Sequence, residues 1–527
     1  MNHPFTGTGH LIRLILRRDR IRLPLWIFGI TATVGFSAGA VQDFYKTPEQ
    51  IASYAQTIES SASARLFGGV PYDLDNLGGI TAYEVTAVAT IALALMVIFF
   101  VIRHTRGEEE AGTSELVRSA VIGRHAATLA TLVVALGCVA IVGALDAAVL
   151  TAVGLPAADS VAHGVALAAS GLVFTGVAAL SAQVVSSARG ALALAGTVLG
   201  VFFVGRGWAA GERSDLVWLS PMAWQEGVRP FGETRWWLLI PLLALAALLL
   251  LIAGTLTARR DFGAGLVHPR KGRARAVRFT TTPVGLALRT QRGLVIGWAA
   301  GLFVLGAVYG SFSQDISTMV EANPEILDVL GGETSDLVRS YYAFVISFTA
   351  IMATAFTITS ALRLRHDERA GLAESILATG VSRTRWALAA ITVAIVASAL
   401  MMLLIGLGSA LTHLATTGDG ELFWPIVGAA LSYVPAAVLL VGLVVLLHGW
   451  APRFAPVVWV VFAFALLQSY LGEILNLPDW VSAISPFWHL PLVPSEPFAV
   501  APGAVLAGAG LVGIGLGLVG LRRRDVS

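Results

Sequence analysis

The chain has 527 residues, of which 56% are hydrophobic and 13% are charged, and its mean hydropathy is +0.77. Soluble domains carry about 25% charged residues, so this composition excludes an ordinary set of soluble domains. The formal net charge is only +2. The single cysteine, Cys138, excludes an intrachain disulfide and a cysteine-based metal cluster.

Long apolar stretches predict helices that cross a membrane. Runs of roughly 18 or more residues with almost no charge are long enough to span the hydrocarbon core. We therefore expect an all-α integral membrane protein with about 12 transmembrane helices. The predicted spans are 24–41, 82–102, 126–153, 161–186, 190–207, 236–257, 294–312, 342–362, 386–413, 425–447, 454–472 and 503–521.

The distribution of basic residues predicts how these spans are oriented. Twelve spans place both termini on the same side, and 28 of the 35 Lys and Arg residues fall in segments on that side. Cytoplasmic loops are the loops rich in Lys and Arg. Both termini are therefore predicted to be cytoplasmic, in a multi-pass protein of the bacterial plasma membrane whose first span is retained.

An internal repeat divides the chain into two halves of six spans each, and this even number gives the repeats parallel topology. We expect a first permease half at 1–257, a basic cytoplasmic linker at 258–280 and a second half at 281–527. Transporters commonly place their pathway at such a repeat interface. At a constant offset, Arg106, Glu109, Gly112 and Glu115 recur as Arg365, Glu368, Gly371 and Glu374.

Each half opens with a basic segment that predicts an amphipathic helix before its first span. Arg13, Arg17 and Arg20 fall on one helical face, with apolar residues roughly opposite. This pattern suits a short helix lying on the inner leaflet. The second copy, around Arg289 and Arg292, is weaker. Plain flanking positive charge is the alternative interpretation.

Motifs for bond chemistry are missing from the sequence. Lys46 and Lys271 are the only lysines, and neither follows the Gly-rich loop that a Walker A motif needs. The H-E-x-x-H, G-x-S-x-G and CxxC patterns are also absent from the sequence. We expect no catalytic, cofactor or metal site in this chain, and no nucleic-acid partner.

A few polar residues inside predicted spans are candidates for a substrate pathway. Asp146 is the only acid deep in a span, and an intramembrane acid is a functional candidate by default. A helix-packing hydrogen bond is the alternative. Ser347, Thr354 and Thr357 share one face of the eighth span, where they form a pathway wall or bond to neighbouring helices. We expect His163, His413 and His448, which lie near span ends, at the membrane interface.

The loops after the second and eighth spans mix acids with arginines at equivalent places. They contain Arg-Gly-Glu-Glu-Glu-Ala-Gly-Thr-Ser-Glu at 106–115 and Arg-His-Asp-Glu-Arg-Ala-Gly-Leu-Ala-Glu at 365–374. Acids are scarce elsewhere on this side of the protein. A docking surface for a cytoplasmic partner explains both clusters better than a solvated helical hairpin does.

These features together resemble the permeases of type 2 ABC exporters, in the double-length form identified as polyketide-antibiotic or multidrug exporters of actinobacteria. The resemblance covers the whole chain. It rests on the repeated R-x-x-E-x-A-G-x-x-E loops, the basic helix before the first span of each half, and Ser220-Pro221 and Ser485-Pro486 before the sixth and twelfth spans.

The resemblance implies a mechanism and a set of partners. Coupling helices at 104–125 and 363–385 would sit on two copies of a separate ATPase subunit, which would bind ATP and Mg. Amphipathic or hydrophobic small molecules such as antibiotics would be exported out of the cell, and membrane lipid would be a further partner. The coupling residues would be Arg106, Glu109, Gly112, Glu115, Arg365, Glu368, Gly371 and Glu374, and the pathway spans 82–102, 190–207, 342–362 and 454–472.

Two other functions remain open from the residues alone. A twelve-span secondary transporter driven by an ion gradient would need several buried ionisable residues, whereas Asp146 is the one clear candidate. A membrane-bound enzyme such as a lipid transferase would need clustered His, Asp or Glu residues near one face. The sequence therefore favours the exporter permease.

Overall fold

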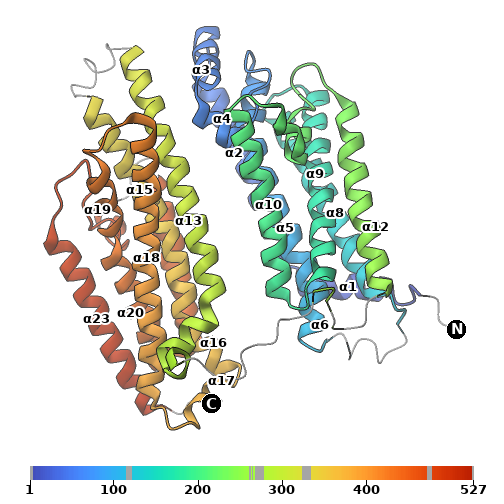
Figure 1. Ribbon diagram of the computed structural model, residues 1–527. Coiled ribbons are helices and arrows are strands. Elements are labelled where there is room, and N and C mark those ends of the chain that lie inside the picture. Colours follow the sequence, from blue (N-terminus) through green and yellow to red (C-terminus); the bar gives the residue numbers. More distant parts are fainter. Residues whose placement is uncertain are drawn as a thin grey trace. The chain divides into compact units, whose positions relative to one another are not determined.

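The computed structural model describes residues 4–113, 115, 122–259, 263, 265–267, 278–322, 334–471 and 478–524. Within these residues twelve helices are long and apolar enough to cross a membrane. The chain separates into two compact units, Met1–Lys271 and Gly272–Ser527, with six of these helices in each (Figure 1). An all-helical membrane protein with twelve spans is thereby confirmed.

Unit 1 is built around α5 and α9, whose spanning windows are mostly buried, whereas α2, α10 and α12 bury only about a fifth of theirs. Its core joins the apolar faces of these helices with that of α8. The helices are α1 (Thr8–Arg18), α2 (Arg22–Phe44), α3 (Pro48–Ser60), α4 (Ala62–Gly68), α5 (Leu77–Ile102), η1 (Arg103–Gly107), α6 (Glu108–Glu110), α8 (Ala126–Ala152), α9 (Ala157–Val184), α10 (Ala188–Gly211), η2 (Asp215–Leu219), α11 (Pro221–Glu226), η3 (Trp236–Leu238) and α12 (Leu239–Arg259).

Unit 2 is built around α15, and its core also takes in α18, α19 and α20. In a membrane the hydrophobic effect does not drive helices together, so their association depends on close van der Waals packing. Small residues permit this close packing in unit 2. The helices are η4 (Arg278–Thr281), α13 (Pro283–Ala322), α15 (Thr334–Ala361), α16 (Arg363–Arg369), α17 (Leu372–Leu377), α18 (Arg383–Thr417), α19 (Phe423–Leu431), α20 (Val434–Trp450), η5 (Pro452–Val457), α21 (Val458–Leu471), α22 (Asp479–Ser482) and α23 (Val500–Arg523).

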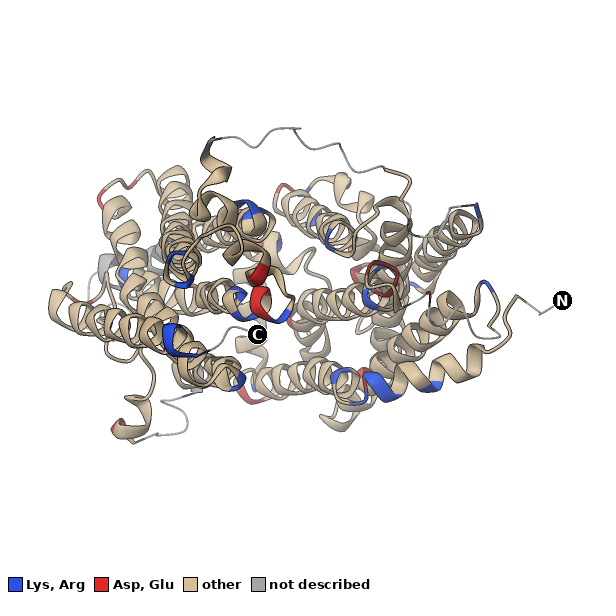
Figure 2. Cartoon of the chain, turned by 90° about the horizontal axis from the view of Figure 1, so that it is seen from below, with Lys and Arg blue, Asp and Glu red and all other residues tan. Residues whose placement is uncertain are grey.

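We call the end of unit 1 that carries α1 and α6 its basic end, and the same name is used for the end of unit 2 that carries α16 and α17. Figure 2 views these ends, and Lys and Arg residues mark the near ends of several helices. The opposite ends are called the far ends. In unit 1 the far end includes α3, α4 and α11, so the segment 42–80 between the first two spans contains two short helices.

The helix before the first span differs between the two units. In unit 1, α1 is a separate helix whose Leu11 and Ile15 are buried, as the amphipathic pattern predicts. Pro24 lies just inside α2, and a proline ring clashes with the carbonyl four residues earlier, so α1 cannot run on into α2. In unit 2, Arg289 and Arg292 belong to the continuous helix α13, because no proline follows Pro283 within it.

The three histidines near span ends, His163, His413 and His448, are buried within their units. At Gly196 and Gly200 of α10, no atom of the described residues in a neighbouring element lies within 4 Å of a Cβ built on the glycine. Close packing occurs elsewhere, for example where Gly449 of α20 meets the backbone of Gly517 in α23.

Candidate functional site

The segment after α5 carries the predicted coupling residues of unit 1. α5 passes through the π-helical turn η1 into the short α6, and π-helical turns are frequent at functional sites. Arg106 is fully buried there, with its Nη1 2.6 Å from the Oε2 of Glu109, and its Nε donates to the carbonyl of Ala182 on α9 over 3.2 Å. Because an unpaired buried charge is costly, this pair fastens the segment to α9.

The helical segment ends at a left-handed turn. Gly112 has a φ of 72°, a conformation that glycine adopts without the penalty of a Cβ and that commonly terminates helices. Beyond it, Glu115 is exposed, and its backbone N–H bonds to the carbonyl of Gly112 over 3.2 Å. Residues 114 and 116–121 of the predicted coupling element 104–125 lie outside the described residues.

The three consecutive acids of α6 all contact other parts of unit 1. Glu108 pairs with Arg18 of α1, and Glu109 pairs with Arg106. Glu110 accepts a hydrogen bond of 2.8 Å from the backbone N–H of Ala188, where α10 begins. Acids are favourable at such helix N-termini. The acidic run, including the exposed Glu110, is therefore paired within the unit, and Glu115 is a further exposed acid beyond it.

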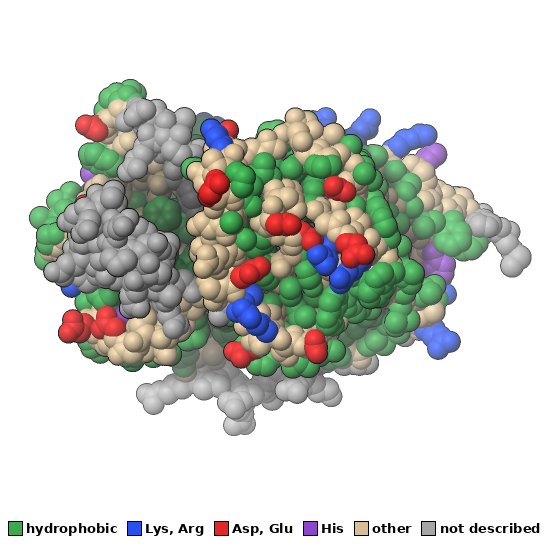
Figure 3. Space-filling view, turned by 90° about the horizontal axis from the view of Figure 1, so that it is seen from above, with side chains coloured by type: hydrophobic (Ala, Val, Ile, Leu, Met, Phe, Trp, Pro, Cys, Tyr) green, Lys and Arg blue, Asp and Glu red, His purple; other side chains and the backbone are tan. Residues whose placement is uncertain are grey.

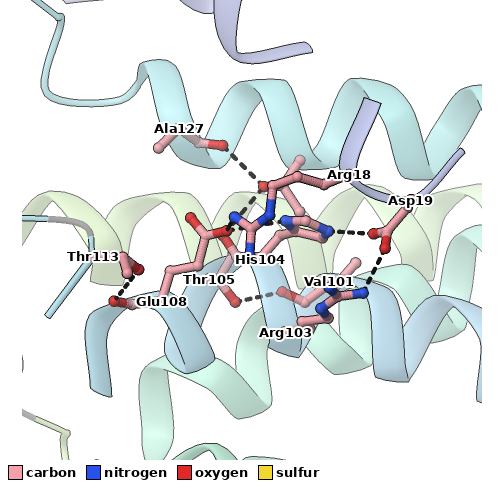
Figure 4. A network of polar contacts seen from close by, with 10 residues as sticks. Arg18, Asp19, Val101, Arg103, His104, Thr105, Glu108, Thr113 and Ala127 are labelled. Carbon is pink, nitrogen blue, oxygen red and sulfur yellow. Dashed lines mark hydrogen bonds and ion pairs between the residues drawn. The ribbon is translucent and has the colours of Figure 1, made fainter. Parts of the chain in front are cut away.

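A polar network joins α1 to the end of α5 (Figure 4). Asp19, in the turn between α1 and α2, is buried; its two carboxylate oxygens lie 2.5 Å from Nη1 of Arg103 and 2.5 Å from Nε2 of His104. The other ring nitrogen of His104 lies 3.2 Å from Glu108, which also binds Arg18 at 2.5 Å. Burial alone would raise the pKa of Asp19, but hydrogen bonds and charges from His104 and Arg103 hold it below its usual value.

Unit 2 holds the equivalent acid in a different way. Glu368 of α16 is buried, and its carboxylate receives two hydrogen bonds from Arg524, of 2.6 and 2.5 Å. The Nε2 of the buried His448 on α20 lies 3.1 Å from the same carboxylate. Arg365, which corresponds to Arg106, is half-buried. The repeat therefore keeps the acid but takes its main cation from the end of α23.

The turn and the exposed acid occur again in unit 2. Gly371 has a φ of 69°, close to that of Gly112. α17 begins directly after it, and Glu374 lies exposed in the first turn of that helix. Seven of the eight predicted coupling residues thus fall into three groups, namely acids and an arginine paired within a unit, glycine turns, and exposed acids, and Arg365 is the eighth.

Asp146 belongs to a buried chain of three polar side chains at the far end of unit 1. Its Oδ2 lies 2.7 Å from Nδ1 of His163 on α9, and Nε2 of that ring lies 3.0 Å from the hydroxyl of Thr86 on α5. The other carboxylate oxygen of Asp146 is buried without a hydrogen-bond partner. Asp146 therefore connects three spans, and it lies nearer the end of α8 than its middle.

A buried ion pair lies close to this chain. Arg206 of α10 pairs with Glu226 at the end of α11, and it also donates to the carbonyls of Phe67 and Gly68 over 2.7 and 3.1 Å. Burial raises the pKa of Glu226 despite the neighbouring guanidinium. Figure 3 shows the surface above, where acidic and basic side chains lie among hydrophobic ones.

A small cavity is lined by residues of both groups. Its volume is about 30 Å³, enough for one or two water molecules. The ion pair between Asp73 and Arg229 borders it. Its lining also includes Thr86, His163 and Glu226, so the buried polar chain and the ion pairs form one region, which we call the far-end polar region.

The three polar residues predicted on the eighth span point into unit 2. Ser347, Thr354 and Thr357 are all buried on α15. The Thr354 hydroxyl donates to the carbonyl of Ile351 over 2.6 Å, and the Thr357 hydroxyl lies 2.7 Å from that of Ser398 on α18. In this conformation Thr354 therefore bonds to its own helix, and Thr357 bonds to a neighbouring helix.

Sequence reasoning missed several of these contacts. Arg206 lies inside the predicted span 190–207, and an arginine within a span is itself a functional signal that could have identified it. Glu226 and Arg524 carry no comparable signal, because each depends on a partner that is far away in the sequence. Glu109 and Glu368, which are expected at a docking surface, also pair with arginines of their own units, and the sequence does not indicate these pairs.

Comparison with known proteins places the chain among efflux permeases. A family profile described as "Multidrug efflux system permease Rv1217c, C-terminal domain" matches residues 281–522. The "Multidrug efflux system permease protein Rv1217c" of Mycobacterium tuberculosis is 38% identical over 528 aligned residues, which cover 99% of this chain and 96% of that protein. With such coverage and twelve spanning helices, the chain belongs to the multidrug efflux permeases of the double-length ABC exporter type.

Proposed function

We propose that this chain is the transport subunit of an exporter that moves amphipathic or hydrophobic small molecules out of the cell. The observation that carries the proposal is the full-length similarity to a multidrug efflux permease. The two equivalent segments after α5 and α15, each with a glycine turn followed by an exposed acid, support it further.

Energy would come from a separate ATPase subunit bound at the basic ends. Two copies would bind, one for each unit, and they would carry the ATP and Mg. Glu115 and Glu374 are the proposed contacts, because they are exposed while Glu109 and Glu368 are occupied within their units. The residues of the permease would then perform no bond chemistry and would alternate access to the substrate.

The proposed orientation puts both termini and both basic ends in the cytoplasm. Of the 35 basic residues, 28 lie in segments on that side of the spans, and cytoplasmic loops are enriched in such residues. Lys46 and Trp218, which belong to opposite-side segments of unit 1, would then be extracellular. Labelling of cysteines placed there from outside intact cells tests this orientation.

The proposed pathway follows α5, α10, α15 and α21, with Asp146 beside it in unit 1 and Ser347, Thr354 and Thr357 on α15. These side chains are buried in the present conformation. Export would therefore require that they become accessible when the protein changes conformation. Cysteine substitution of Thr354 and labelling with and without ATP hydrolysis measures that change.

The experiment that tests the function reverses both exposed acids, in Glu115→Arg with Glu374→Arg. We expect the double variant to insert normally but to lose co-purification of the ATP-binding subunit and stimulation of its ATPase. Like charges would then face each other across the interface. Each single reversal should have a partial effect, because two segments would serve two ATPase copies.

Matched controls keep the result specific to these positions. Glu212→Arg reverses an exposed acid on the far side of unit 1 and should leave both readouts at wild-type values. Normal co-purification and normal ATPase stimulation in the well-expressed double variant would remove Glu115 and Glu374 from the interface. A wild-type permease that stimulates no ATPase subunit and exports no amphipathic compound would contradict the proposed function itself.

A further inference from the structure

The end of α23 contacts three separate parts of the basic end of unit 2. The guanidinium of Arg524 binds the Glu368 carboxylate of α16 through two hydrogen bonds, and its Nη2 lies 3.3 Å from Nε2 of His448 on α20. The backbone carbonyl of Arg524 accepts a hydrogen bond of 2.6 Å from Arg383, where α18 begins. Arg522 binds the hydroxyl of Thr384 over 2.8 Å.

The carboxylate at the centre of these contacts is enclosed. The Glu368 side chain is 6% exposed and that of His448 is 2% exposed. A bidentate arginine–carboxylate pair fixes both distance and orientation, whereas a single charge contact fixes distance alone. Removing one member of a buried pair leaves the other charge uncompensated, so the position of α16 depends on Arg524.

Unit 1 shows what this contact replaces. The equivalent acid, Glu109, takes its cation from Arg106 only three residues earlier, within the same segment. In unit 2 the cation comes from residue 524, which directly follows the last spanning helix. A movement of α23 would therefore reach the second segment directly through this pair, whereas the pair in unit 1 is local.

We infer that Arg524 is the positioning residue of the second coupling segment: it ties Glu368, and with it α16 and the exposed Glu374, to the end of α23. The inference rests on the proposed function, since it assumes that an ATPase subunit contacts this segment. Arg524 itself touches neither substrate nor nucleotide in this role. It acts through Glu368.

A double-mutant cycle on the full-length permease with its ATP-binding subunit tests the inference. Arg524→Gln and Glu368→Gln should each lower ATPase stimulation at least about tenfold, because breaking a buried charge pair typically costs more than the free energy of a tenfold change. The double variant should be no worse than the stronger single, since both remove one interaction. Arg524→Lys keeps the charge but loses the paired hydrogen bonds, and should be intermediate.

Arg523→Gln is the matched control. The neighbouring guanidinium of Arg523 lies 6.0 Å from the centre of the Trp450 ring, and this surface contact should contribute little to stability. We expect its stimulation to stay within about twofold of wild type. Losses that multiply in the double variant, or normal stimulation in Arg524→Gln, would overturn the inference.

Hydrogen exchange on the permease alone separates this inference from the proposed function. In Arg524→Gln, peptides covering 363–378 should exchange faster than in wild type, whereas those covering 103–113 of unit 1 should not change. Arg523→Gln should show neither effect. Unchanged exchange at 363–378 would overturn the inference, while a wild-type complex without ATPase stimulation would contradict only the proposed function.

Discussion

The two units differ mainly in where they bury charge. At its far end unit 1 encloses the pair of Arg206 and Glu226 and the chain from Asp146 to Thr86. Aligned on their Ser-Pro pairs, unit 2 has Leu490 and Pro491 where unit 1 has Gln225 and Glu226. At the basic ends both units pair the equivalent acid with an arginine, which lies three residues earlier in unit 1 and directly after the last span in unit 2.

The comparison shows which parts of the repeat the fold requires. Both units keep the left-handed glycine and the exposed acid that follows it, so these features do not depend on how the segment is anchored. The anchors differ: unit 1 uses Arg106 and α1, and unit 2 uses Arg524. Buried charge is therefore a property of each unit separately, and substitutions should affect the units differently.

The largest effect is expected for Arg206→Ala. It leaves the buried carboxylate of Glu226 unpaired and two backbone carbonyls without their donor, and removing one partner of a buried pair costs about 3–5 kcal/mol. We expect poor expression or a clearly lowered melting temperature in detergent. Arg213→Ala removes an exposed arginine of the same end and is the control; equal stability of the two variants would refute the buried pair.

A similar loss is expected for His163→Ala, which leaves Asp146 buried without its partner. The double replacement Asp146→Leu with His163→Phe should recover the melting temperature, because apolar groups often replace a buried pair without loss of stability. If Asp146 belongs to the pathway, transport should stay low in the stable double variant. Full transport by that double variant would show that Asp146 does not belong to the pathway.

Backbone strain should affect both units to a similar extent. Gly112→Val and Gly371→Val force a branched residue into the left-handed region, at a cost of roughly 1–2 kcal/mol. Asparagine tolerates this region better, so Gly371→Asn should retain more ATPase stimulation than Gly371→Val. No described atom lies within 4 Å of the added Cβ at either glycine. Equal activity of the valine and asparagine variants would argue against a strained turn.

The smallest effect is a difference in pH dependence. The pKa of Asp19 lies below its usual value, so the stabilisation from this carboxylate is present above about pH 4 and is lost as the pH falls through the lowered pKa. Asp19→Asn should therefore lower the melting temperature at neutral pH and matter less in strong acid. If the melting temperatures of Asp19→Asn and wild type differed by the same amount at neutral pH and in strong acid, Asp19 would not be stabilised as a carboxylate by the network around His104.

Much of the fold was readable because each feature is local in the sequence. Apolar runs gave the twelve spans, and the spacing of Arg13, Arg17 and Arg20 predicted α1. The repeated R-x-x-E pattern located both segments after α5 and α15. The pairing of its acids could not be predicted, because Glu109 and Glu368 have equivalent neighbours in sequence but different cations in space.

The same limit applies to the far-end polar region. Asp146 stood out because it is an acid inside a span, but its partner His163 comes from the next helix, and a histidine near a span end looks interfacial. Only the packing of α5, α8 and α9 brings Thr86, Asp146 and His163 together. Local patterns therefore identified the residues, and tertiary packing decided their roles.

Cross-linking from the two segments to the ATPase subunit tests the central claim most directly. Cys138 is the only cysteine and is buried, so Cys138→Ala provides a background in which Glu115→Cys or Glu374→Cys introduces a single thiol. We predict that both variants cross-link to the ATP-binding subunit, while Lys46→Cys in the same background does not. Cross-linking from Lys46 alone, or from neither segment, would contradict the account.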